Sequence, residues 1–123
     1  MNVVLWILQV LLALAFLAHG WLFLAPPPEV AVQMNANLPR WFQLFLGVAE
    51  VSAAVGIILP GVTRVLPRLG PAAAAGGMIG TASALGFHLW RHEWSSAGTT
   101  AVLLALATFV AYGRTRLRPI LPR

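Results

Sequence analysis

The stretch from Trp41 to Leu59 constrains the fold more than any other part of the chain. It is almost wholly apolar, yet it carries a carboxylate, Glu50, near its middle. Such a segment is typical of a helix that spans a bilayer. A charge at its centre is costly unless it is protonated, paired or turned toward a polar cavity. We therefore expect another part of the chain to supply a partner for Glu50.

Three further apolar runs accompany this stretch, and together the four cover residues 2–24, 41–59, 71–90 and 96–112. Each run is long enough to cross roughly 30 Å of hydrocarbon as a helix. Continuous apolar runs favour helices over strands. Only 9% of the residues are charged, against roughly 25% in soluble domains. We predict one all-α domain over residues 1–123, an integral membrane protein built as a four-transmembrane-helix bundle.

Helix-breaking residues lie between these runs. Three consecutive prolines from Pro26 end the first run, and Pro60 with Gly61 is expected to end the second. The 25–40 connection is the longest, and its middle, 29–36, is a candidate for a short interfacial helix. The first run lacks a preceding basic residue and is long, which favours a retained helix over a cleaved signal peptide.

The arginines predict the orientation of the bundle. With four crossings, both termini and the 60–70 connection share one side, which carries six of the eight arginines. The positive-inside tendency makes this side cytoplasmic and the 25–40 connection extracytoplasmic. The net charge is +5, and the arginines that produce it lie between and after the apolar runs. We therefore expect contact with the lipid bilayer and no binding of nucleic acid. The arginines of the cytoplasmic side are Arg64, Arg68, Arg114, Arg116, Arg118 and Arg123, and those of the other side are Arg40 and Arg91.

Polar side chains from three of the runs are predicted to meet in the outer half of the membrane. The predicted ligand-binding residues are His19, Gln43, Glu50, Thr81 and His88. We expect them to line a cavity for a hydrophobic small molecule or lipid with a polar head, with Glu50 and His19 as the proton-handling, catalytic pair. In the alternative interpretation, Glu50 only fastens the helices together by bonding to His19, His88 or a backbone donor.

Neither a metal nor a haem is predicted. His88 and His92 share a helix face, a spacing that two metal ligands can use, and Glu93 follows them. However, the chain has no cysteine and no His-Glu-x-x-His motif, and these residues lie at an expected helix end. Two membrane histidines, His19 and His88, are a weak basis for haem. The residues alone leave the cofactor open.

Small residues predict close contacts between helices. Gly76 and Gly80 form a GxxxG motif in the third run, and Ser52 and Gly56 repeat this spacing in the second. Such spacing lets helix backbones approach closely. The first interpretation is packing within one bundle, and the second is contact in a homo-oligomer or a larger membrane complex.

Four motifs together resemble the DoxX-like family of small four-helix bacterial membrane proteins. They are Ala18-His-Gly-Trp-Leu-Phe-Leu24, Gly47-Val-Ala-Glu50, Ile58-Leu-Pro60 and Phe87-His88. The resemblance covers nearly the whole chain and rests on the order and spacing of the motifs. It implies a four-helix bundle in the bacterial cytoplasmic membrane, an acidic position at Glu50, and a link to quinone or redox chemistry.

Three functions follow as hypotheses. The first is an accessory subunit of a membrane redox or quinone-linked system, or a small membrane enzyme that binds a hydrophobic ligand. The second is a small proton-coupled multidrug-type transporter, a class that also uses one membrane glutamate. The third is a purely structural or assembly subunit. Whether the chain is itself an enzyme is left open.

Overall fold

The computed structural model describes residues 1–122, with the side chains of Met34 and Asn37 left aside. Arg123, counted above among the arginines that orient the chain, lies outside the described residues. The described chain is all-helical, with 84% of its residues in helices and no strand. Its elements are α1 (Asn2–Leu24), α2 (Pro28–Asn37), α3 (Arg40–Thr63), α4 (Leu69–Trp90), α5 (Trp94–Tyr112) and a π-helical turn, η1 (Gly113–Leu117).

Three segments of the described chain are long and apolar enough to cross a membrane: Asn2–Leu24, Arg40–Thr63 and Trp94–Leu117. The prediction of apolar membrane-spanning helices is therefore confirmed for α1, α3 and α5 with η1. The Ala- and Gly-rich α4 has 22 residues but does not join them. Its crossing of the membrane stays a prediction. The interfacial segment expected within the 25–40 connection is helical, as α2.

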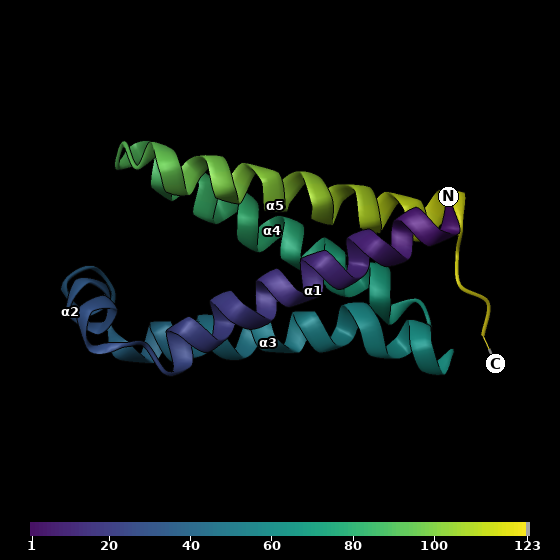
Figure 1. Ribbon diagram of the computed structural model, residues 1–123, viewed down its shortest axis with the longest axis horizontal. Helices are drawn as coiled ribbons and strands as arrows, with labels where there is room; N and C mark the ends of the chain where they lie inside the picture. Colours follow the sequence, from purple (N-terminus) through teal and green to yellow (C-terminus); the bar gives the residue numbers. More distant parts are fainter. Residues whose placement is uncertain (123) are drawn as a thin grey trace.

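The long helices form two pairs. α1 packs chiefly against α3, and α4 against α5, while α3–α4 and α1–α5 contacts join the pairs. Figure 1 shows both chain termini at one end of the bundle, here called the terminal end. α2 and the 91–93 turn lie at the opposite end, here called the far end, where the two pairs stand apart in this view.

The core lies where the two pairs meet. Phe16 of α1 packs against Gly77 of α4, because a Cβ on Gly77 would come within 2.8 Å of the Phe16 ring. Small residues on α4 thus let a large side chain of α1 fill the space between the pairs. The buried core residues include Leu12, Phe16, Ile57, Ala74, Ala107 and Val110.

The GxxxG motif of α4 is not used in this packing. A Cβ on Gly76 or Gly80 would meet no atom within 4 Å. Packing within one bundle, the first interpretation of this motif, is therefore wrong for these two glycines. The similar spacing on α3 is used, since a Cβ on Gly56 would lie 2.9 Å from Ala73.

The expected end of the second helix is also wrong. α3 continues through the buried Pro60 and ends at Thr63, with Arg64 in the left-handed conformation at φ 59°. Proline removes one backbone hydrogen bond, but membrane helices tolerate it when neighbouring helices compensate. The end of α3 is therefore set by the left-handed residue Arg64 and not by Pro60.

Candidate functional site

A glycine pair brings α1 and α3 into backbone contact. A Cβ on Gly20 would lie 3.0 Å from the carbonyl oxygen of Gly47, and a Cβ on Gly47 would lie 3.0 Å from that of Gly20. Any side chain here would push the two helices apart. Because the helices cross so closely, the residues beside this contact, His19 and Glu50, come within hydrogen-bonding distance.

His19 and Glu50 form a direct pair between the two helices. His19 Nδ1 lies 2.7 Å from Glu50 Oε2. With Glu50 ionised, the Nδ1–H donates to the carboxylate, since a carboxylate only accepts. The His19 ring also meets Phe23 edge-on, with 5.0 Å between the ring centroids. The partner that the sequence requires for Glu50 is thus His19.

The second ring nitrogen of His19 is left for another partner. Within residues 1–122, Nε2 accepts or donates no hydrogen bond. The His19 side chain is 49% exposed and that of Glu50 is 22% exposed. Both lie inside helices that are apolar enough to cross a membrane. A half-exposed polar pair at this depth must face lipid, water or a bound molecule, and lipid is the least favourable of the three.

The position of His19 also sets the direction of the pair. His19 follows Phe16 by nearly one helical turn, so the two side chains share a face of α1. Phe16 packs against α4. His19 therefore extends from α1 to about the same side as Phe16, one turn nearer the far end.

His88 and Thr81 make contacts of their own on α4. His88 Nδ1 lies 3.0 Å from Glu93 Oε1, and this pair closes the end of α4. The Thr81 hydroxyl donates to the Gly77 carbonyl oxygen at 2.7 Å, within the helix. The structure thus brings together only His19 and Glu50 among the predicted ligand-binding residues.

Gln43 is fully buried, and its amide is occupied. Its Nε2 donates to Asn35 Oδ1 and to the Leu38 carbonyl oxygen, both at 3.0 Å. Its Oε1 accepts from Arg40 Nη1 at 3.2 Å. These bonds attach α2 to the start of α3 and leave the amide no further donor.

Arg40 has a structural role that was not predicted from the sequence. Its guanidinium donates to the carbonyl oxygens of Phe23 at 2.8 Å and Leu24 at 2.9 Å. These are carbonyls that the last turn of α1 leaves without a helical partner. The position of Arg40 directly after Pro39, at the start of the next helix, was the sequence signal that could have indicated this role.

A second polar cluster lies near the terminal end. Gln9 Nε2 donates to the Ile57 carbonyl oxygen at 2.8 Å, and Arg114 Nε donates to Gln9 Oε1 at 2.5 Å. The position of Arg114 after the last apolar run predicts only an influence on topology. A glutamine inside an apolar run was the available hint, because such a group needs a partner.

Two of the three carboxylates in residues 1–122 pair with a histidine, namely Glu50 and Glu93. The described chain has no group of three His, Cys, Asp or Glu side chains close enough to hold a metal ion. The far end therefore carries two His–Glu pairs, one between α1 and α3 and one at the turn after α4.

Comparison with known protein families gives a match over most of the chain. The family model described as the DoxX-like family matches residues 7–110 of the 123. Comparisons with curated proteins and with solved structures yield no match. The matched region contains His19 and Glu50 and extends from α1 to α5.

Proposed function

We propose, from the premise that this chain belongs to the DoxX-like family of membrane proteins, that it binds a hydrophobic molecule with a polar head group beside His19 and Glu50. A quinone is the chemical class that fits best. In this proposal the chain serves as an accessory subunit of a membrane redox system.

The observation that carries the proposal is the 2.7 Å contact between His19 and Glu50, with half of the imidazole exposed. Glu50 fixes the ring through Nδ1 and leaves Nε2 free to meet a ligand. A quinone carbonyl accepts hydrogen bonds, and its ring and tail are apolar. Such a molecule satisfies both the imidazole and the apolar helix surfaces around it.

The pair can also bind and donate a proton. An imidazole has one donor and one acceptor when neutral, and the adjacent carboxylate stabilises its protonated form. His19 would donate from Nε2 to the ligand's carbonyl oxygen, while Glu50 holds the ring and its charge. Gln43 would support the site indirectly, by fixing α2 and the start of α3.

The topology that accompanies this proposal has four crossings. α4 is taken as the fourth, so that both termini face the cytoplasm, where the arginines gather. The His19–Glu50 pair then lies in the outer half of the membrane.

Binding of a short-tailed quinone to the purified chain in detergent micelles tests the proposed site. Glu50→Gln should weaken binding at least about tenfold, because a hydrogen bond involving a charged group is replaced by a neutral one. It should also flatten the dependence of affinity on pH. The readout is equilibrium dialysis of the quinone at several pH values.

Glu93→Gln is the matched control, because it removes the other carboxylate that pairs with a histidine. We expect it to change quinone affinity by less than about twofold, because Glu93 shares no hydrogen-bond partner with Glu50. An unchanged affinity and pH profile for Glu50→Gln would reject the proposed role, and the structural subunit would then be the better interpretation.

A further inference from the structure

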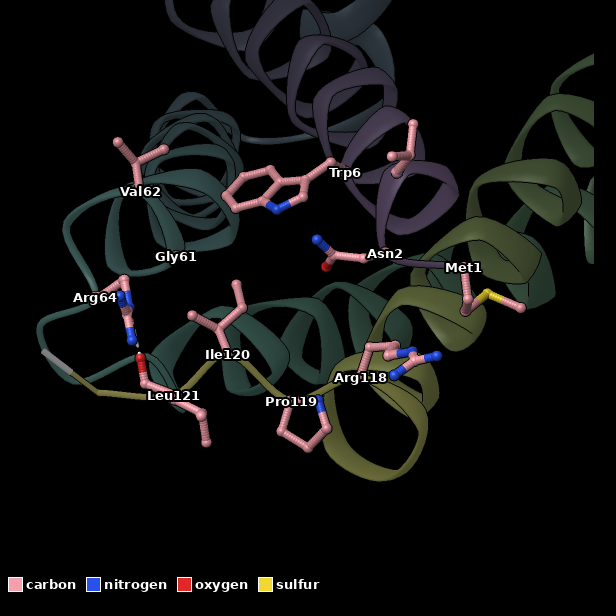
Figure 2. A pocket seen from close by; sticks show the side chains of 11 residues that line it. Met1, Asn2, Trp6, Gly61, Val62, Arg64, Arg118, Pro119, Ile120 and Leu121 are labelled. Carbon is pink, nitrogen blue, oxygen red and sulfur yellow. Dashed lines mark hydrogen bonds between the residues drawn. The ribbon is translucent and has the colours of Figure 1, made fainter.

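A cleft of about 780 Å³ opens at the terminal end, between the start of α1, the end of α3 and the C-terminal tail. Figure 2 shows Arg64 and Arg118 on opposite sides of its opening, with Asn2, Trp6 and Ile120 between them. Arg64 Nε donates to the Leu121 carbonyl oxygen at 2.9 Å, which holds the tail as one wall. The cleft is thus both cationic and apolar.

A buried guanidinium lies beside this cleft. Arg114 is only 3% exposed. Its Nη1 donates to Asn2 Oδ1 at 2.6 Å and to the Arg118 carbonyl oxygen at 3.0 Å, and its guanidinium carbon lies 5.1 Å from the centroid of the Trp6 ring. Its Nη2 is buried without a partner in residues 1–122. Every acceptor of Arg114 is neutral, so its positive charge is not compensated.

No acidic side chain of residues 1–122 pairs with an arginine at this end. The chain has three acidic side chains. Glu50 pairs with His19, Glu93 pairs with His88, and Glu29 belongs to α2. The terminal end therefore gathers unopposed positive charge, which favours an anion from outside the chain. The described arginines of this end are Arg64, Arg68, Arg114, Arg116 and Arg118.

An apolar groove continues from the cleft along α1. It has a volume of about 380 Å³ and shares Val3 and Trp6 with the cleft before passing Ile7, Val10 and Leu11. At about 1.5 Å per residue it extends roughly 12 Å along the helix. Because α1 is a candidate membrane span, the groove runs from the membrane surface toward the hydrocarbon. The apolar groove would contribute nothing to the binding of a small anion, whereas an acyl chain could pack along it.

We propose that this cleft and groove form a binding site for one anionic glycerophospholipid. Its phosphate lies between Arg64 and Arg118, and one acyl chain follows Val3, Ile7 and Val10 along α1. Arg114 adds to the positive potential from beneath, through Asn2 and Trp6. This site lies at the opposite end of the bundle from the His19–Glu50 pair and does not depend on the function proposed there.

Native mass spectrometry of the full chain in detergent, titrated with phosphatidylglycerol or phosphatidylcholine, tests the site. We expect one phosphatidylglycerol to bind at least about tenfold more tightly than phosphatidylcholine, since each basic side chain at a membrane surface favours anionic lipid. Arg64→Gln with Arg118→Gln should abolish this preference. Arg64→Lys with Arg118→Lys should retain it, because the charges remain.

The control removes the same charge elsewhere. Arg68 and Arg116 are exposed residues of the same end that do not line the cleft. Arg68→Gln with Arg116→Gln should change the preference by less than about twofold. An equal loss in this control would replace the site with a diffuse electrostatic effect. Inorganic phosphate that competes with phosphatidylglycerol at similar concentration would reject the lipid in favour of a small anion.

Discussion

At the scale of single residues, Gln43 is the clearest case of a polar group that holds elements together. It is fully buried and bonds to Asn35, Leu38 and Arg40. Gln43→Leu should lower the free energy of unfolding by about 1–3 kcal/mol, because buried partners lose their hydrogen bonds. Denaturant titration in mild detergent measures this, and hydrogen exchange should show earlier opening of α2.

A distant surface position provides the comparison for Gln43. Ser83 is exposed on α4, and its hydroxyl bonds only within its own helix. Ser83→Ala should stay within about 0.5 kcal/mol of the parent protein. If Gln43→Leu were equally neutral and α2 exchanged at an unchanged rate, Gln43 would not be the anchor of α2.

At the scale of elements, α4 offers two glycines with opposite surroundings. Gly77 faces the Phe16 ring of α1, whereas Gly80 has open space. Gly77→Ala should destabilise the fold by about 1–3 kcal/mol, since the crowded ring must move and separate the helix pairs. Gly80→Ala should be neutral or stabilising by up to about 1 kcal/mol, from helix propensity. Parallel unfolding curves of the two variants measure the difference.

The two alanine variants share their chemistry and their helix, so any effect of the detergent on helix propensity applies to both. A loss of stability in Gly80→Ala as large as that in Gly77→Ala would contradict the monomeric packing. It would indicate that a second copy or a partner covers the Gly76–Gly80 face, as the homo-oligomer interpretation holds.

At the scale of the whole molecule, the proposed four crossings would place α2 and the 91–93 turn on one side and the 64–68 connection on the other. The chain has no cysteine, so single cysteines report the side without interference. We expect Val32→Cys and Trp94→Cys to react with an impermeant maleimide in intact cells, because both positions are exposed at the far end. Val65→Cys, at the terminal end, should react only after permeabilisation.

Labelling of Trp94→Cys tests whether α4 crosses the membrane. If α4 does not cross, Trp94→Cys will behave like Val65→Cys, and the number of crossings will fall to three. If all three positions report reversed sides, four crossings stand and the positive-inside orientation is wrong.

Much of the fold was predictable because helix formation in a bilayer depends on local properties. A long apolar run must satisfy its backbone within itself, so the lengths of the runs predicted the helices. The first run matched α1 at both ends. Pro60 misled the prediction of the second, since a buried proline is tolerated when surrounding packing compensates, and packing is not local.

By itself, the sequence determined the all-helical membrane class, the need of Glu50 for a partner and the uneven distribution of arginines. Only the tertiary structure decided which histidine meets Glu50. The sequence makes His19 and His88 equally plausible partners for Glu50. The Gly20–Gly47 backbone contact sets the crossing of α1 and α3 and brings His19 to Glu50. His88 pairs with Glu93 instead. Such choices depend on helix rotation and crossing points, which arise from packing between distant segments and leave no local pattern in the chain.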